Sequence, residues 1–312
     1  MSIKAICYKT GRIRDLGDKN LQKFAYIVEE KYTGQSIRDV LREEFQISRR
    51  MLKRLRWEGK IYLNHEEAML WYPVKAGDCI LALADLHLEA PKLHFPRDQQ
   101  PVFQNKDLVV MSKKPGQVVH KSLNSQLVDL CGLISDQALH PVQRLDRDTT
   151  GLVIIALNAY THYRLSQSKM VKKYLGICHG QLDQAEGIID APIARAQDSI
   201  MEREVSCEGK PAQTGYRVLA HAEEPDLSLV EFQLYTGRTH HIRVHTHYLG
   251  HPLLGDSMYG LNQALDADLG RQALHAYHLE FPLPYTEDRI VLDDPVPPDM
   301  QAVLNRYQFI QL

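Results

Sequence analysis

The stretch QRLDRDTTG at residues 143–151 is followed directly by the apolar run LVIIAL at residues 152–157. Six consecutive apolar residues next to turn-forming residues predict a buried strand. The turn that leads into this strand contains four charged residues. Arg144 and Arg147 flank Asp146, and nearby positive charge favours the ionised carboxylate. Such a carboxylate can act as a nucleophile or a base, although the same residues could equally form an ion-pair network that stabilises the loop.

Other short apolar segments predict further elements of the same domain. The predicted strands are Leu108 to Met111, Tyr174 to Cys178 and Val230 to Leu234, with a predicted helix near Tyr160 to Ser168. These segments indicate a mixed α and β architecture. The chain has no G-x-S-x-G, G-x-G-x-x-G, P-loop or H-E-x-x-H motif, which removes support for serine hydrolases, Rossmann dehydrogenases, P-loop NTPases and zincins.

A second dense stretch, TGRTHHIRVH at residues 236–245, follows the strand that ends at Leu234. Five histidines fall between His240 and His251. His241 and His245 stand four residues apart, so a zinc site on a helix is conceivable, but no cysteine ligand or H-E-x-x-H motif accompanies them. We therefore expect these histidines to hydrogen-bond the backbone or phosphates, and we predict no metal.

The stretch RRMLKRLRWEGK at residues 49–60 has six basic residues and one acid, a local charge of +5 in a chain of net charge −2. Met51, Leu52 and Leu55 recur at helical spacing and predict the buried side of an amphipathic helix with Ser48 as its N-cap. The basic side chains that we expect to meet a polyanion are Arg49, Arg50, Lys53 and Arg56. The alternative is a merely solvated face, which is the usual role of such a run taken alone.

The composition is that of an ordinary globular chain, with 44% hydrophobic and 24% charged residues among 312. The longest apolar runs hold six residues, well short of the roughly 18 that a membrane helix needs, and residues 1–20 contain no apolar stretch typical of a signal peptide. We therefore expect a cytoplasmic protein without a membrane partner. The five cysteines are widely separated and form no C-x-x-C pair, which indicates reduced thiols.

The length exceeds what one hydrophobic core usually supports, so two domains are expected. Pro91 and Pro96 limit regular structure between them. We assign residues 1–85 to a small N-terminal domain with an extension, residues 86–99 to a linker and residues 100–312 to a larger domain.

Several motifs in the larger domain occur in the order found in one enzyme family. They are Arg144-Leu-Asp146 with Thr149-Thr-Gly151, Lys172-Lys-Tyr174, Lys210-Pro-Ala-Gln-Thr214, Gly237-Arg-Thr-His240 with Ile242-Arg-Val-His245, and Gly250-His-Pro252. Over residues 100–285 the chain resembles the RluA-type pseudouridine synthases. Residues 20–85, from Ser36-Ile-Arg-Asp-Val-Leu41 to Ala76-Gly-Asp78, resemble the alpha-L RNA-binding domain. The resemblance implies an α+β fold, with a mixed, largely antiparallel bent sheet preceded by a small alpha-L domain.

The resemblance also implies roles for individual residues. Asp146 would be the catalytic aspartate, Tyr174 would contact the target base, and Arg243 would be the basic partner of the aspartate. The implied substrate-binding residues are Arg144, Lys172, Arg238 and His240, of which Arg144 would help to occupy the space opened by base flipping. The implied RNA-binding residues are Arg49, Arg50, Lys53 and Arg56. Gln143 and His241 depart from the family pattern, which commonly has His and Gln there, and this puts the fine contacts in doubt but not the reaction class.

The implied reaction converts uridine to pseudouridine by breaking a carbon–nitrogen bond, turning the uracil and rejoining the ribose through carbon 5. No redox change occurs, so no cofactor or metal is expected. The carboxylate could attack the anomeric carbon or act as a base at the neighbouring ribose carbon, and the sequence does not choose between these routes. The expected partner is large-subunit ribosomal RNA, with transfer RNA as a possibility, and the expected state is a monomer.

Two other functions remain as alternatives. One is a non-catalytic RNA-binding or RNA-chaperone protein that keeps the fold, for which loss of Asp146 would be the mark. The other is a glycosidase or nucleosidase with a pair of carboxylates, in which Asp148 would be the second. Asp146 is present, and a helper only two residues away is more readily explained as a loop-stabilising contact.

Overall fold

The computed structural model describes residues 12–13, 21–45, 47, 49–85, 91–120, 129–261, 264–284 and 288–311 of the chain. They form two compact units. The first takes in residues up to Pro91 together with Asn158–Arg164, and the second takes in Lys92–Leu157 and Leu165–Leu312. The expected Ser48 cap, the N-terminal extension up to Gly11 and residues 86–90 of the expected linker lie outside the described residues. No helix in the described ranges is long and apolar enough to cross a membrane.

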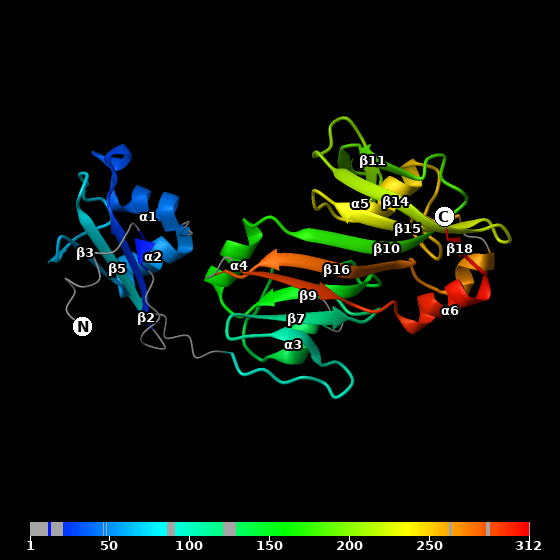
Figure 1. The fold of residues 1–312 in the computed structure, drawn as a ribbon, viewed down its shortest axis with the longest axis horizontal. Coiled ribbons are helices and arrows are strands. Elements are labelled where there is room, and N and C mark those ends of the chain that lie inside the picture. The colour runs from blue at the N-terminus through cyan, green and yellow to red at the C-terminus, as the bar shows by residue number, and fades with distance from the viewer. Residues whose placement is uncertain are drawn as a thin grey trace. The chain divides into compact units, whose positions relative to one another are not determined.

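The first unit combines a five-stranded sheet with two helices (Figure 1). The strands are ordered β1-β2-β5-β3-β4. In chain order the elements are β1 (Arg12–Ile13), β2 (Leu21–Ile27), the 3-10 turn η2 (Glu30–Tyr32), α1 (Ile37–Phe45), α2 (Arg49–Glu58), β3 (Lys60–Leu63), β4 (Glu66–Glu67) and β5 (Cys79–Asp85).

The two helices form because their apolar residues recur at helical spacing. Met51, Leu52 and Leu55 of α2 are buried, as their spacing predicted. Each such side chain contributes about 1.5–3 kcal/mol when fully buried. The opposite side of α2 presents Arg49, Lys53 and Arg56, which are exposed, while the side chain of Arg50 lies outside the described part. The amphipathic helix expected from the sequence is therefore present.

The second unit is built on one large sheet, with β10, β16, β9 and β7 side by side (Figure 1). Its elements are β6 (Pro101–Gln104), β7 (Leu108–Lys113), α3 (Leu130–Ile134), β8 (His140–Pro141), β9 (Thr150–Ala156), β10 (Val171–His179), β11 (Glu186–Asp190), β12 (Ile193–Arg195), β13 (Arg203–Val205), β14 (Gln213–Ala222), β15 (Leu227–Leu234), α5 (His241–Tyr248), the 3-10 turn η3 (Ala264–Asp268), β16 (Leu274–Pro282), β17 (Arg289–Asp293), α6 (Pro298–Arg306) and β18 (Ile310–Gln311). Helix α4 (Ala159–Ser166) connects β9 to β10 along the chain.

The main path of this sheet is β11-β14-β15-β10-β16-β9-β7-β6. Among the ladders of the described residues, β9 with β16 is parallel and the others are antiparallel. The mixed, largely antiparallel sheet expected from the resemblance is therefore confirmed. Topology explains how distant motifs meet, because β10 lies between β15 and β16 although these strands are far apart in the sequence.

Strand β9 holds the middle of the core and starts directly after the charged turn. All seven of its residues are buried. Val153 and Ile155 belong to one apolar cluster, and Leu152 and Ile154 belong to another, so both faces of the strand are covered. Gly151 has a φ of +111°, and a Cβ there would lie 2.3 Å from the carbonyl oxygen of Ala276. Only glycine permits this approach of β9 to β16.

The cysteines follow the expectation only in part. Cys131, Cys178 and Cys207 are free thiols, but Cys79 is disulfide-bonded. The expectation of reduced thiols throughout was therefore wrong at Cys79, because spacing along the sequence does not decide which cysteines pair.

Candidate active site

Asp146 lies in the charged turn that precedes β9, next to a buried residue and partly exposed to solvent. Its neighbour Leu145 is buried in the main core cluster. The N–H of Thr149 donates to the carbonyl oxygen of Asp146 at 3.2 Å, which closes the turn. The side chain of Asp146 keeps 25% of its surface exposed. The carboxylate is thus held in place while it stays open to a ligand.

A buried arginine on α5 reaches this carboxylate. Nη1 of Arg243 donates to Oδ2 of Asp146 at 3.3 Å. The other two nitrogens of Arg243, Nε and Nη2, donate to the two carboxylate oxygens of Asp256, both at 2.7 Å. The ring of Tyr259 lies 5.0 Å from the guanidinium carbon. This fork fixes the guanidinium plane, so the nitrogen that faces Asp146 cannot rotate away.

The two carboxylates differ in what remains available to a substrate. Asp256 has no exposed side-chain surface and also accepts hydrogen bonds from the N–H groups of Met258 and Tyr259 at 3.0 Å each. Burial raises the pKa of Asp256, but Arg243 and these N–H groups outweigh it and leave the pKa below its usual value. For Arg243, burial lowers the pKa and the carboxylates outweigh it, so the pKa is raised and the guanidinium stays charged. Asp146 is therefore the reactive candidate of the pair.

Arg147 does not pair with Asp146, although its position in the sequence suggested that its charge would favour the ionised form of Asp146. Its Nε and Nη2 donate to Oδ2 of Asp148 at 2.9 and 2.8 Å. Asp148 also accepts from the N–H of Gly116 at 3.2 Å. Arg144 is exposed. The guanidinium that contacts Asp146 comes from α5, about a hundred residues away, because the turn directs Arg147 toward its other neighbour.

Two buried cations that the sequence analysis did not single out hold the backbone of this turn. Lys113 at the end of β7 is 1% exposed, and its Nζ donates to the carbonyl oxygens of Lys114, Gln117 and Arg147 at 2.9, 2.8 and 2.6 Å. Burial lowers the pKa of Lys113 to about 7, against the pull of Asp148 and Asp146. Arg271 donates to the carbonyl oxygen of Asp148 at 3.2 Å. A lysine next to a turn-forming proline and glycine was the available signal, but it could not reveal the contact with Arg147.

Tyr174 lies on β10 opposite Phe232 and is 6% exposed. Burial, together with the charge of Asp146, raises its pKa. The neutral phenol is therefore strongly favoured, which suits ring contact with a base better than proton abstraction by a phenolate. Lys172 stands two residues earlier and shares the face of Tyr174, and burial lowers its pKa.

The turn before α5 positions His240 and Arg238. His240 has a φ of +56°, an uncommon conformation for a residue with a side chain, and its Nδ1 lies 2.9 Å from the hydroxyl oxygen of Tyr259. Burial lowers the pKa of His240. Nε of Arg238 donates to the carbonyl oxygen of Pro211 at 3.0 Å. His240 and Tyr259 thus join the network around Arg243, whereas the Nε of Arg238 faces the backbone.

The zinc alternative on α5 fails on geometry. Nδ1 and Nε2 of His245 lie 2.9 Å from the hydroxyl of Thr214 and 2.9 Å from the carbonyl oxygen of Ala191, so both ring nitrogens are engaged. His241 is buried, and its Nδ1 accepts from the N–H of Arg238 at 3.3 Å, while its Nε2 has no partner in the described part of the chain. Burial lowers the pKa of His241 to about 3. The pair holds α5 in place rather than offering two free ligands.

Comparisons with known proteins place this geometry in a family. Residues 107–248 match the model of RNA pseudouridylate synthase, and residues 24–80 match that of the RluD ribosomal pseudouridine synthase N-terminal domain. The RNA pseudouridine synthase YjbO of Bacillus subtilis is 34% identical over 84% of this chain and 95% of its own length. The chain belongs to the RNA pseudouridylate synthase family. The resemblance to the RluA type and the prediction of an isomerase are confirmed.

Further relatives of the synthase support the same placement. Ribosomal large subunit pseudouridine synthase D of Vibrio cholerae is 33% identical over 88% of this chain and 91% of its own length. Among solved structures, human RNA pseudouridylate synthase domain containing 4 matches with a TM-score of 0.52 and 26% identity over 67% of this chain and 93% of its own. Human RNA pseudouridylate synthase domain containing 1 shares the fold, with a TM-score of 0.54 and 24% identity over 69% of this chain and 89% of its own.

Proposed function

We propose that Asp146 is the catalytic carboxylate of this synthase. The observation that carries the proposal is the contact of 3.3 Å between Asp146 and a guanidinium that Asp256 holds in a fixed fork. A carboxylate that is anchored, ion-paired and partly exposed can attack the anomeric carbon or take a proton from the neighbouring ribose carbon. Both routes use the same carboxylate, and both release uracil for rotation.

The target uridine must leave the RNA stack before Asp146 can reach its ribose. Flipping costs a few kcal/mol, which aromatic and phosphate contacts offset. We assign the contact with the flipped base to Tyr174, which shares the surroundings of Asp146. Substrate contacts of Lys172, Arg238 and His240 and the filling role of Arg144 follow from the family resemblance.

We propose large-subunit ribosomal RNA as the substrate, with residues 1–85 as the RNA-binding domain, 86–99 as the linker and 100–312 as the catalytic domain. The names of the relatives in Vibrio cholerae and Nitrosomonas europaea and the match of residues 24–80 support this choice. The exposed Arg49, Lys53 and Arg56 on α2 supply charge for phosphates. A ribosomal substrate fits a monomeric enzyme in the cytoplasm.

Replacing Asp146 with Asn tests the catalytic assignment. Asp146→Asn keeps shape but removes the charge, so tritium release from RNA labelled at carbon 5 of uridine should fall by several orders of magnitude while RNA binding persists. Asp148→Asn is the matched variant and should stay within about tenfold of the wild type, because Asp148 contacts Arg147 and Gly116. Equal losses in both would favour a carboxylate pair, and activity in Asp146→Asn would reject the assignment.

The substrate is tested separately by mapping pseudouridine in cells with and without the gene. We expect one or more sites in large-subunit ribosomal RNA to disappear and to return when the wild-type gene, but not the Asp146→Asn gene, is supplied. Loss confined to transfer RNA would overturn the ribosomal assignment and leave the catalytic one intact.

A further inference from the structure

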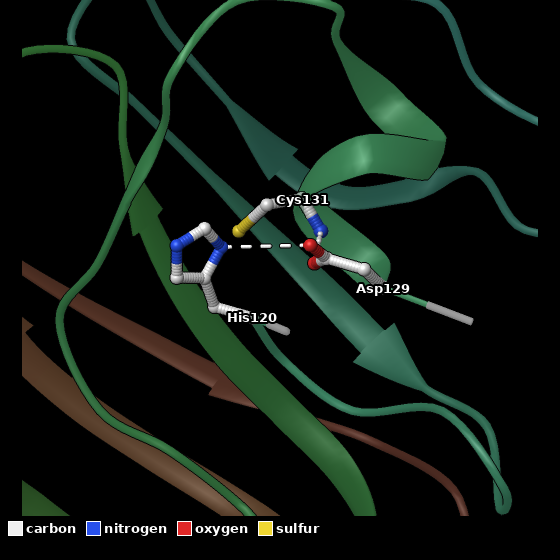
Figure 2. A group of neighbouring side chains, drawn as sticks. All are labelled: His120, Asp129 and Cys131. Atoms are coloured by element: carbon white, nitrogen blue, oxygen red, sulfur yellow. Dashed lines mark hydrogen bonds and ion pairs between the residues drawn. The ribbon is translucent and has the colours of Figure 1, made fainter. Parts of the chain in front are cut away.

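Outside the candidate active site, three side chains with metal-ligand atoms converge beside α3. They are His120, Asp129 and Cys131, and Figure 2 shows the imidazole, the carboxylate and the sulfur facing one another. Nδ1 of His120 lies 3.5 Å from Oδ2 of Asp129. One ligand atom of each residue lies within 4.8 Å of those of the other two. Neither the reaction nor the comparisons assign this group a role.

The backbone itself brings the three side chains together. Val118 and Asp129 form a parallel bridge, and the N–H of Leu130 donates to the carbonyl oxygen of Val118 at 2.9 Å. Oδ1 of Asp129 accepts from the N–H of Cys131 at 3.0 Å, which turns the other oxygen toward His120. These backbone contacts hold Asp129 and Cys131 in place and bring residue 120 close to them.

The ligand types and the separation of His120 from Asp129 fit one class of ion. Zinc prefers cysteine sulfur at about 2.3 Å and histidine nitrogen or carboxylate oxygen at about 2.0–2.2 Å, so tetrahedral ligand atoms lie roughly 3.3–3.7 Å apart. The separation of 3.5 Å between His120 and Asp129 already lies in this range. Hard ions such as magnesium would disfavour the sulfur.

We propose that His120, Asp129 and Cys131 form a binding site for one zinc-type divalent cation. Three protein ligands leave a fourth position for water, on the side where His120 is 56% exposed. Binding replaces the thiol proton of Cys131 with a metal–sulfur bond, and the proton passes to the solvent. The ion joins His120 to Asp129 and Cys131 at the start of α3. Its role is structural, so the proposal is independent of the isomerisation.

The proposed metal site is connected to the candidate active site through the backbone. The stretch from Lys113 to His120 begins where Lys113 and Gly116 contact the charged turn, at Arg147 and Asp148. An ion bound at His120 would restrict residues 113–120 without touching substrate. We therefore expect metal to affect stability more than chemistry.

Cobalt(II) provides a direct test, because cobalt bound to a thiolate gives an intense charge-transfer absorption that histidine and carboxylate alone do not give. The full-length protein, stripped with a chelator, should bind one cobalt ion with this band, and zinc should displace it. His120→Ala and Asp129→Asn should each weaken binding by more than about tenfold. Asp129 is the N-cap of α3, and Asn can keep that cap, while His120 is exposed, so both variants should fold.

The exposed free thiol Cys207 supplies the control, since Cys207→Ser should bind cobalt like the wild type. Zinc should raise the melting temperature of the wild type and of Cys207→Ser, but not that of His120→Ala, because only a folded site gains from the ion. The proposal is overturned if the stripped protein shows no thiolate band, if the band survives in both ligand variants, or if Cys207→Ser removes it.

Discussion

Arg243 contacts two carboxylates whose surroundings give them different chemical roles. Asp256 is enclosed and hydrogen-bonded at both oxygens, so it serves to hold the guanidinium. Asp146 receives one hydrogen bond from Arg243 and keeps a quarter of its surface exposed. A buried guanidinium that lost its carboxylate partner would cost about 3–5 kcal/mol, so Asp256 supports both the fold and the site.

The geometry of the fork leads to a prediction for Arg243→Lys. Lysine keeps the positive charge but cannot bond both oxygens of Asp256 and Asp146 at once, so Asp146 loses its orientation. We expect the rate at saturating RNA to fall by roughly 10²-fold or more, with little change in RNA affinity. Single-turnover tritium release and a binding titration would measure the two effects.

The exposed pair of Arg289 with Glu280 provides the control for that substitution. Arg289→Lys changes the same chemical group outside the site and should leave the rate unaltered. A rate near wild type in Arg243→Lys would show that the orientation of the guanidinium does not matter for the reaction.

At the scale of elements, the sequence predicted several of the core strands and helices but not their partners. The apolar run at residues 152–157 gave β9, and the spacing of Met51, Leu52 and Leu55 gave α2. The order of the motifs also predicted Asp146, Tyr174 and Arg243 as catalytic residues. Periodicity reports which face of an element is buried, but it does not report which element covers that face.

The contacts that could not be predicted are those between side chains of one element and residues of another. Lys113 at the end of β7 contacts Arg147 in the turn before β9. Arg243 on α5 contacts Asp256 in the loop that follows this helix. The sequence offers 39 acidic residues as partners for a buried arginine, and no pattern selects Asp256 among them. Only the folded backbone makes that choice.

His241, the first residue of α5, leads to a prediction about how stability depends on pH. Burial lowers the pKa of His241 from 6.5 to about 3, so between these values the unfolded chain binds a proton there and the folded chain does not. Stability contributed by His241 is therefore present above pH 6.5 and lost as the pH falls toward 3. From pH 6.5 to 5 the loss is up to about 2 kcal/mol.

His241→Gln removes this titration, so its free energy of unfolding should fall less steeply than that of the wild type between pH 6.5 and 5. Urea denaturation at several pH values would measure the slopes. Parallel curves for wild type and His241→Gln would show that His241 does not titrate differently on folding.

At the scale of the whole molecule, two units carry different kinds of side chain. The second unit contains Asp146, Arg243 and Tyr174, whereas the first presents exposed basic residues on α2. Contacts with phosphates that are equal in the ground and transition states raise affinity without raising the rate of chemistry. We therefore expect RNA capture by α2 and catalysis in the second unit to be separable by mutation.

A quadruple variant tests this separation. In it, Gln replaces Arg49, Arg50, Lys53 and Arg56. RNA binding should weaken, and each lost phosphate contact should reduce the slope of log affinity against log salt by about 0.7–0.9. The rate at saturating RNA should stay near that of the wild type, whereas the rate at low RNA should fall, because the catalytic residues are unchanged.

Activity measured against RNA concentration at two salt levels distinguishes capture from a merely solvated face. The matched control removes the same number of positive charges from the second unit, at the exposed Lys92, Lys106, Lys169 and Arg289. If the basic residues of α2 bind RNA directly, the control keeps the affinity and the salt slope of the wild type. The α2 variant then binds more weakly and with a smaller salt slope. If both variants bind like the wild type, α2 is a solvated face and the second unit captures RNA alone. Equal loss in both would mean that total charge, rather than α2, attracts the RNA.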